Sequence, residues 1–253
     1  MFAIAARLMG LMLLVVSLVG FSLPASAFGN DAQFEAKVLQ VLRDHPETII
    51  QSLQAYQQKQ RQEQQKRQQA FLEEMKANPK AVIGSSPTKG AATQDIVLVL
   101  FSDFQCPYCA TVRETLKQFM LEHGDRVTLV YKNLPLTEIH QQALPAAFSA
   151  WAAGQQGKFW EYYEALFAQQ KSLGEPLYQA TAKAFGLDME RFERDRSSDA
   201  AGIALGKDIE MARTLAIEGT PFLVMNGEAI PGAVELADLE AVFKKVSASN
   251  TLQ

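Results

Sequence analysis

The chain has few of the residues that build disulfide-rich or metal-binding proteins: two cysteines and three histidines among 253 residues. A structural zinc ion needs four ligands, and His45, His123 and His140 show no ligand spacing, so we expect neither a metal site nor a cofactor. After residue 23 no segment is apolar enough for a membrane span. The net charge of −4 argues against a nucleic-acid partner. We find no internal repeat.

The first 27 residues are typical of an export signal. Arg7 provides a short positive region, residues 8–23 are apolar and small, Pro24 breaks the helix, and Ala25-Ser26-Ala27 fits a cleavage site. Residue 28 is Phe, so no lipid attachment is expected after cleavage. An uncleaved anchor is the disfavoured alternative, because the apolar run is short. Cleavage would leave about 226 residues and, with Arg7 lost, a charge near −5.

The two cysteines lie together in a Cys-Pro-Tyr-Cys motif. The apolar run 96–101 predicts a buried strand before them, and 110–121 predicts a helix after them. Cys106 is therefore expected in the first turn of this helix, where unpaired N–H groups and the helix dipole favour the thiolate. A structural disulfide to Cys109 would close a very small loop and add little stability. The motif predicts a thiol–disulfide redox site.

Each residue of the motif has an expected role. Cys106 is the expected nucleophile, and Cys109 the thiol that resolves the mixed disulfide. Pro107 removes a backbone donor and stiffens the turn, while Tyr108 places an aromatic edge beside the sulfurs, so both are expected to tune the redox potential. Asp103 leaves two interpretations open. It is either a carboxylate that relays a proton and raises a cysteine pKa, or an exposed strand-end carboxylate or a cap of the redox helix.

Residues 28–78 differ in composition from the rest. Two short apolar stripes at helical spacing predict helical structure, with a stop and restart at Asp44-His45-Pro46. Almost every residue in 57–69 is Gln, Lys, Arg or Glu, and core packing cannot hold such a helix. This stretch is predicted to be an exposed helical or flexible spacer. The apolar stripes before it need a partner, either the catalytic region or the same segment of another subunit, and we favour self-association. They consist of Phe34, Val38, Leu39, Val41, Leu42, Ile49, Ile50, Leu53 and Tyr56.

The rest of the chain divides into a predicted linker, 79–94, and a catalytic region, 95–253. Within that region we expect strands at 96–101, 126–131, 222–225 and 229–230, a helical block at about 137–218, and a closing helix at 236–246. His140 is expected to be a cap or a satisfied surface histidine. Aromatic residues at helical spacing are expected in the core of the block rather than in a substrate groove: Trp151, Phe159, Trp160, Tyr162, Tyr163 and Phe167.

Two segments resemble parts of the DsbA-like thiol–disulfide oxidoreductases. The segment 101–109, Phe-Ser-Asp-Phe-Gln-Cys-Pro-Tyr-Cys, looks like their active-site segment, and 219–222, Gly-Thr-Pro-Phe, looks like their cis-proline loop. The resemblance implies an α/β thioredoxin fold with an inserted helical domain, preceded by an N-terminal helical extension. It also implies that a cis Pro221 faces the cysteines and that Thr220 binds an extended substrate strand.

The N-terminal segment is similar to that of the ScsC-like branch (suppressor of copper sensitivity) of this family. The similarity lies in the helical restart at Pro46-Glu47-Thr48-Ile49, the polar spacer and the DsbA-like region after it, although the Gln-rich composition departs from the branch. Members of the branch oligomerise through their N-terminal helices, and some are trimeric disulfide isomerases.

The resemblance implies a periplasmic disulfide isomerase or reductase that acts on unfolded or misoxidised exported proteins. It would be a homo-oligomer, with a trimer favoured, and a membrane redox partner would keep it reduced. A monomeric dithiol oxidase is the nearest alternative. A copper-handling protein is another, since two thiolates suit Cu(I), but no Met-rich or His-rich tract accompanies the pair. A holdase for unfolded chains is a fourth possibility.

Overall fold

The computed structural model describes residues 32–250, so the expected export signal lies outside the described part. The chain divides into two compact units, 1–59 and 60–253, and the boundary falls inside one helix. The first unit contains α2 (Ala32–Asp44) and the beginning of α3 (Pro46–Ala77). The helix break at His45 is where the sequence predicts it. Within residues 32–250 no helix is long and apolar enough to cross a membrane.

The apolar stripes of the first unit are exposed in the single chain. All nine side chains keep between 41 % and 66 % of their surface accessible: Phe34, Val38, Leu39, Val41, Leu42, Ile49, Ile50, Leu53 and Tyr56. No residue of α2 is buried. Within the described part of the chain, these side chains are therefore largely exposed.

The second unit is built on a five-stranded sheet with the order β1-β3-β2-β4-β5. β2 and β3 pair in parallel at the centre, and the other pairs are antiparallel. Every residue of β2 and β3 is buried, as expected for strands that are covered on both faces. The strands are β1 (Thr88–Gly90), β2 (Ile96–Ser102), β3 (Val127–Asn133), β4 (Phe222–Met225) and β5 (Glu228–Pro231).

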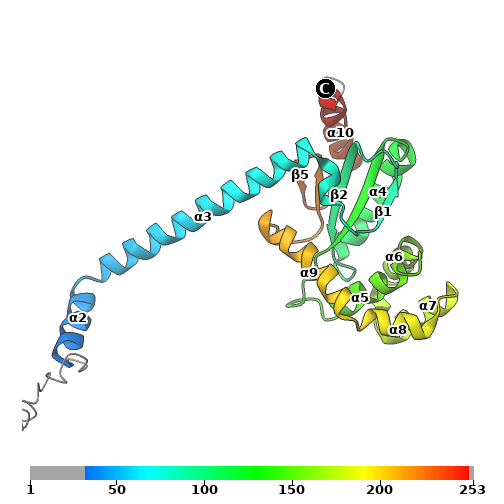
Figure 1. Cartoon of the computed structure of the whole chain (residues 1–253). Helices are drawn as coiled ribbons and strands as arrows, with labels where there is room; N and C mark the ends of the chain where they lie inside the picture. Colours follow the sequence, from blue (N-terminus) through cyan, green and yellow to red (C-terminus); the bar gives the residue numbers. More distant parts are fainter. Residues whose placement is uncertain (1–31, 251–253) are drawn as a thin grey trace, which may run out of the picture. The chain divides into compact units, whose positions relative to one another are not determined.

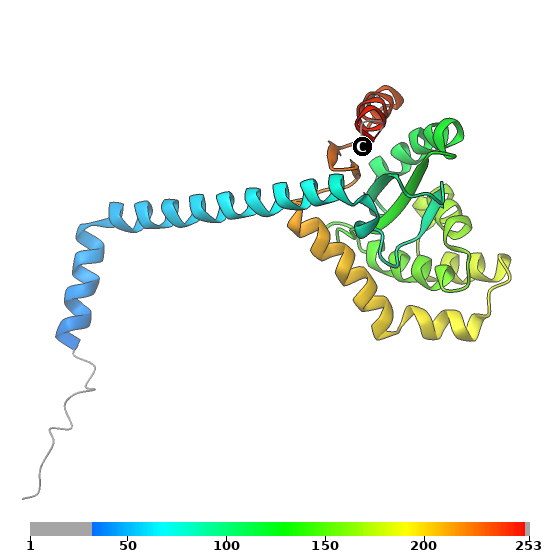
Figure 2. The ribbon, with the colours of Figure 1, turned by 45° about the horizontal axis from the view of Figure 1, so that its top comes forward.

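Helices cover both faces of the sheet. α4 connects β2 to β3, and α5 to α9 form one helical group between β3 and β4, as the sequence predicts for the block at 137–218 (Figures 1 and 2). The α-helices are α4 (Pro107–His123), α5 (Ala143–Gly154), α6 (Phe159–Ala168), α7 (Glu175–Ala184), α8 (Met189–Arg196), α9 (Asp199–Thr214) and α10 (Leu236–Asn250). Two short 3-10 helices are η1 (Pro79–Val82) and η2 (Gln170–Ser172).

Alternate residues of β2 face two separate cores. Leu98 and Leu100 belong to the larger core, which contains α4, α10 and the helical block. Val97 and Val99 belong to the second core, to which α9 contributes. The expected placement of the block's aromatic residues is confirmed. Four are buried in the larger core and the two tryptophans pack against it partly buried: Phe159, Tyr162, Tyr163 and Phe167, then Trp151 and Trp160.

The end of α3 belongs to the second core. Met75 is only 1 % exposed, and Phe71 and Leu72 pack beside it partly buried. Nearer the start of α3, two side-chain amides donate to carbonyls at the end of α9. Gln64 donates to Arg213 O at 2.7 Å, and Gln68 donates to the carbonyl of the C-cap residue Leu215 at 2.7 Å. The polar stretch 57–69 is therefore not solely an exposed spacer. Its glutamines satisfy carbonyls that the end of a helix leaves unpaired.

The segment 79–94, expected to be a linker, is instead part of the second unit. β1 pairs antiparallel with β3, and the side chain of Thr128 on β3 donates to Ala91 O at 2.6 Å. Val82 and Ile83 are buried in the second core. The sequence does not predict β1, because its three residues are all exposed and lack the apolar alternation that marks a strand.

Candidate active site

The cysteine pair lies where β2 turns into α4. Cys106 is the N-cap residue of α4, just before the helical turn in which the sequence places it, and Pro107 is the first helical residue. The Cys106 carbonyl accepts the N–H groups of Cys109 at 3.1 Å and Ala110 at 3.3 Å. Both cysteines are free thiols; Cys106 is 4 % exposed and Cys109 is completely buried. This difference leaves Cys106 as the more accessible sulfur.

The two sulfurs have opposite pKa shifts. The pKa of Cys106 is lowered to about 5, chiefly by a hydrogen bond from the Cys109 thiol; Thr220 and the N–H groups of Cys109 and Tyr108 help, while burial opposes the shift. Burial raises the pKa of Cys109, and its hydrogen bond to Cys106 raises it further. A thiolate at Cys106 beside a protonated Cys109 is thus the favoured state at neutral pH. The sequence predicts the low pKa but assigns it to the helix terminus, whereas the partner thiol is the largest cause.

The Thr220–Pro221 peptide bond is cis, as the resemblance implies. The loop lies against the redox pair, because Cys106 Sγ is 3.3 Å from the Thr220 carbonyl oxygen. The Thr220 hydroxyl is buried and closes no hydrogen bond among the described residues, so it acts on the Cys106 sulfur only as a nearby dipole. Phe222, the residue after Pro221, pairs with Phe101 of β2 in the sheet, so the sheet fixes the position of the loop.

Asp103 is buried, which contradicts the interpretation as an exposed strand-end carboxylate. Its side chain is 0 % exposed. The carboxylate accepts the N–H groups of Gln105 at 2.7 Å and Leu136 at 3.0 Å, and it pairs with His140 Nδ1 at 2.7 Å. No side chain caps α4, so the capping interpretation is wrong as well. Asp103 joins the active-site turn to the loop after β3, and its backbone N–H, at 3.5 Å, is the group that reaches Cys109 Sγ.

His140 is satisfied by Asp103, and only 16 % of its side chain is exposed, so it is not a surface histidine. Tyr108 is 64 % exposed and acts on the Cys106 sulfur through its backbone N–H. The sequence does not identify one residue that holds the active-site turn. Gln170 donates to Phe104 O at 2.9 Å and to Cys106 O at 2.8 Å. It lies in η2, and a lone glutamine so distant in sequence gives no signal of this role.

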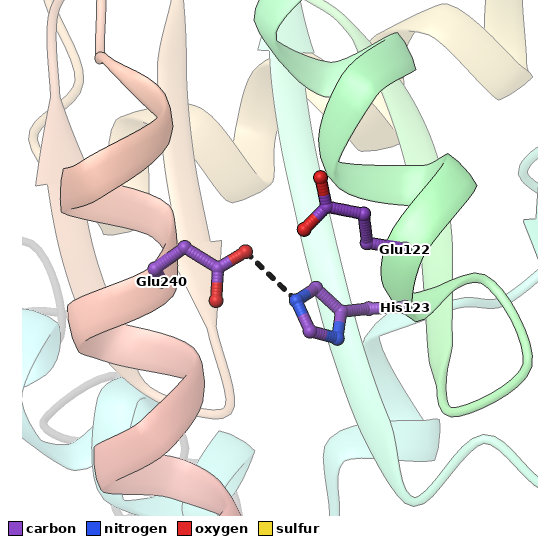
Figure 3. A group of neighbouring side chains, drawn as sticks. All are labelled: Glu122, His123 and Glu240. Carbon is purple, nitrogen blue, oxygen red and sulfur yellow. Dashed lines mark hydrogen bonds and ion pairs between the residues drawn. The ribbon is translucent and has the colours of Figure 1, made fainter.

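Outside the redox pair, one group of possible metal ligands occurs among the residues 32–250. Glu122 and His123 on α4 and Glu240 on α10 bring their ligand atoms within 4.8 Å of one another (Figure 3). His123 Nε2 lies 2.7 Å from Glu240, and the His123 ring packs on Phe119 and Phe243, with centroids 4.9 and 4.2 Å apart. A contact between two helices accounts for this arrangement, and the expected lack of a metal stays a prediction.

Comparisons with known proteins place the redox region in a family. Residues 97–244 match the model of the DSBA-like thioredoxin domain. The curated relatives include the Na(+)/H(+) antiporter NhaA 3 of Salinispora tropica, 31 % identical over 166 residues, with 65 % of this chain and 25 % of the antiporter covered. NhaA 1 of Salinispora arenicola is 28 % identical over 165 residues, with the same coverage. The chain thus spans about a quarter of the length of these relatives.

Solved structures confirm the fold class. A thioredoxin-like oxidoreductase from Silicibacter pomeroyi DSS-3 has a TM-score of 0.58 and 26 % identity, covering 65 % of this chain and 94 % of that one. Proteus mirabilis ScsC has a TM-score of 0.60 and 24 % identity, covering 86 % and 96 %. The thiol-disulfide exchange protein alpha-DsbA2 from Wolbachia pipientis has a TM-score of 0.62 and 21 % identity, covering 71 % and 96 %. The fold is thioredoxin-like, with a helical N-terminal extension.

Proposed function

The chain belongs to the family of DSBA-like thioredoxin domains, and from this membership we propose that it is a thiol–disulfide oxidoreductase with Cys106 and Cys109 as its redox pair. One observation carries the proposal: the pKa of the more accessible sulfur is lowered to about 5, while the pKa of its buried partner is raised. A thiolate at the less buried sulfur, beside a protonated thiol, is the arrangement that thiol–disulfide exchange uses.

The proposed reaction has two exchange steps. The Cys106 thiolate attacks one sulfur of a substrate disulfide, forming a mixed disulfide and releasing the other substrate sulfur as a thiolate that takes up a proton. Cys109 then loses its proton and attacks Cys106 Sγ. This step forms the Cys106–Cys109 disulfide and releases the second substrate thiolate. The reverse sequence donates the disulfide to a substrate dithiol.

The loop at Thr220–Pro221 is the proposed substrate-binding element. Pro221 has no N–H to offer, so the backbone of Thr220 provides the polar groups that an extended substrate strand could pair with. The Thr220 carbonyl already contacts the Cys106 thiol, at 3.3 Å. Pro107 and Tyr108 are the proposed tuning residues, because Pro107 fixes the start of α4 and the N–H of Tyr108 acts on the Cys106 sulfur. A proton relay through Asp103 also remains a proposal.

We further propose that the protein works as a disulfide isomerase or reductase in the periplasm, as a homo-oligomer and most simply a trimer. Its substrates would be misoxidised or unfolded exported proteins, and a membrane redox partner would keep Cys106 reduced. The exposed stripes of α2 and early α3 support self-association, since burial of each large apolar side chain is worth about 1.5–3 kcal/mol. Several redox sites around one substrate would allow a disulfide to be broken in one place and remade in another.

Redox activity is tested by insulin reduction and by refolding of scrambled ribonuclease. The Cys106→Ser variant should lose both activities, because serine cannot form a disulfide. The Cys109→Ser variant should instead accumulate mixed disulfides with its substrates. Substantial activity in a Cys106→Ala variant would refute the proposal.

Self-association is tested by light scattering on the mature chain and on a variant with Ile49→Asp and Leu53→Asp. Both side chains are about half exposed in the single chain, at 48 % and 54 %, so the changes should spare the catalytic unit but break the oligomer and the isomerase activity. Gln54→Asp is the matched control for added charge. A truncation should remove 28–59 and not 28–78, because the longer deletion takes Met75 out of the second core. A monomeric mature protein would favour the dithiol oxidase instead.

A further inference from the structure

Two buried hydroxyl groups next to the redox pair have no ordinary hydrogen bond. Ser102 is 1 % exposed and Tyr131 is 0 % exposed. Neither the Ser102 Oγ atom nor the Tyr131 hydroxyl has a hydrogen-bond partner among residues 32–250. Leaving a buried hydroxyl unpaired costs about 1–3 kcal/mol. Such groups call for a functional explanation when they lie beside reacting atoms.

The sheet register places both hydroxyls on the side of the sheet that faces Cys109. Leu100 on β2 is paired with Tyr131 on β3, and both belong to the larger core together with Cys109. Ser102 lies two residues beyond Leu100, so its side chain points to the same face. Diagonal neighbours on one face are within reach of a long side chain such as that of Tyr131. The sulfur of Cys109 is also close, because the backbone N–H of the next residue, Asp103, reaches it at 3.5 Å.

Both neighbours of Ser102 respond to its hydroxyl. The interaction of Ser102 with Cys109 lowers the pKa of that thiol, against the larger effect of burial, which raises it. The interaction of Ser102 with Tyr131 likewise lowers the pKa of the phenol, although burial still holds that pKa well above its usual value. The phenol therefore stays protonated and remains a donor. Ser102 is thus a neighbour of both the sulfur and the phenol.

We propose that the Ser102 hydroxyl, backed by the Tyr131 hydroxyl, donates a hydrogen bond to the Cys109 thiolate that forms when this sulfur resolves a mixed disulfide. The inference rests on the proposed function. In the dithiol the Cys109 sulfur is only a weak acceptor, whereas its thiolate is a strong one. In that state Tyr131 donates to Ser102 Oγ, and Ser102 donates to Cys109 Sγ. Donors that are already in place where charge develops need no rearrangement as it appears.

The step is balanced without a new reactant. Cys109 gives its proton to the solvent or to the departing substrate thiolate, and its sulfur attacks Cys106 Sγ. The bond between Cys106 and the substrate breaks as the Cys106–Cys109 bond forms. Ser102 and Tyr131 keep their own protons. The other titratable groups that act near Cys109 are Cys106, Tyr163 on α6 and the paired Asp103.

The experiment follows the two exchange steps separately. The reduced mature protein is mixed with oxidised glutathione, quenched with acid and analysed by mass spectrometry. The Cys106–glutathione adduct reports the first step, and the intramolecular disulfide reports the second. Ser102→Ala should slow the second step about tenfold or more, the usual effect of losing a hydrogen bond to a charged group. Its pH profile should move up by about one unit, with the first step close to wild type.

Matched controls separate this role from general packing. Ser149→Ala removes a fully buried serine hydroxyl that donates to Pro145 O within α5, and Tyr162→Phe removes a buried phenol that donates to Tyr178 O. Neither should change the resolving step. Tyr131→Phe should slow the resolving step by less than Ser102→Ala does. If Ser102→Ala does not fold, the rate of this step in Tyr131→Phe tests the proposal in its place.

The outcomes are distinct. Resolution at the wild-type rate in Ser102→Ala, or an equal slowing in Ser149→Ala, would overturn the inference while a normal first step preserves the proposed function. If Ser102→Ala does not fold, an unchanged second step in Tyr131→Phe would overturn it. A wild-type protein that forms neither the glutathione adduct at Cys106 nor the Cys106–Cys109 disulfide would overturn the proposed function, and this inference with it.

Discussion

Replacing Cys106 by serine should remove a pH-dependent part of the stability of the reduced protein. The folded pKa of Cys106 is about 5, and that of an unfolded cysteine is about 8.5. Because the folded pKa is the lower one, the thiolate stabilises the fold fully only above the unfolded pKa, and this contribution is lost as the pH falls through 5. Linkage gives about 2–3 kcal/mol at pH 7 and about 0.4 kcal/mol at pH 5.

The assay is urea unfolding of reduced wild-type protein and Cys106→Ser at pH 5 and pH 7, in excess reductant and at equal protein concentration. Equal slopes against urea show that the two proteins expose similar surface on unfolding. The difference in unfolding free energy should fall by about 2 kcal/mol from pH 7 to pH 5. Oxidised wild type is the control, because neither sulfur titrates in the disulfide. A difference that stays constant between the two pH values would refute the reasoning.

The low pKa of Cys106 also affects the reduction potential of the cysteine pair. A thiolate that stabilises the reduced state raises the reduction potential of the pair, as in strongly oxidising members of the superfamily. Reduced protein should therefore unfold at higher urea than oxidised protein near pH 7, with the gap narrowing towards pH 5.

Three further substitutions test the surrounding structure. Met75→Ala should lower the unfolding free energy, measured in urea, by about 2–5 kcal/mol, because it opens a cavity in the second core. Leu121→Ala is the control: its side chain is 80 % exposed, so the unfolding free energy should change by less than about 0.5 kcal/mol. Equal effects would contradict the assignment of the end of α3 to that core. Lys132→Met should lower the unfolding free energy by about 3–5 kcal/mol, because it removes the cation that lies 3.2 Å from the buried Asp208 carboxylate. Adding Asp208→Asn should restore most of the loss. No recovery would mean that packing, and not charge, is responsible. Asp103→Asn should lower the unfolding free energy by about 1–3 kcal/mol, because the amide places a donor against N–H groups that donate to the carboxylate. A slower resolving step at matched stability would support a proton relay through Asp103, and an unchanged step would exclude the relay.

The sequence predicts the elements whose signals are local. The apolar run before Cys106 predicts β2, and the position of the cysteines at the start of α4 follows from the helical pattern after them. The helical block, the hairpin at Asn226-Gly227 and the break at His45 are similarly marked by spacing or by turn residues. The cis bond before Pro221 was implied by resemblance alone, since most X–Pro bonds are trans.

The remaining features depend on contacts between distant residues. β1 is held by pairing with β3 and shows no apolar alternation of its own. The position of Asp103 in the sequence is compatible with a strand end in solvent as well as with a role beside the cysteines. In the structure its carboxylate is buried and accepts the N–H group of Leu136 in the loop after β3. Gln64 lies in a uniformly polar stretch, so nothing local marks it as the partner of a carbonyl at the end of α9. The tertiary structure decides these roles, and sequence spacing cannot show them.

The central claim, that Cys106 is the attacking sulfur of a thiol–disulfide exchange site, is tested most directly by trapping it. The reduced variants Cys109→Ser and Cys106→Ser are each mixed with oxidised glutathione at pH 7, and their intact masses are recorded. The Cys109→Ser variant should form one stable glutathione adduct per chain at Cys106. The Cys106→Ser variant should form almost none, because its remaining thiol is buried and its pKa is raised. Equal labelling of both variants, or an adduct on Cys109 alone, would contradict the account.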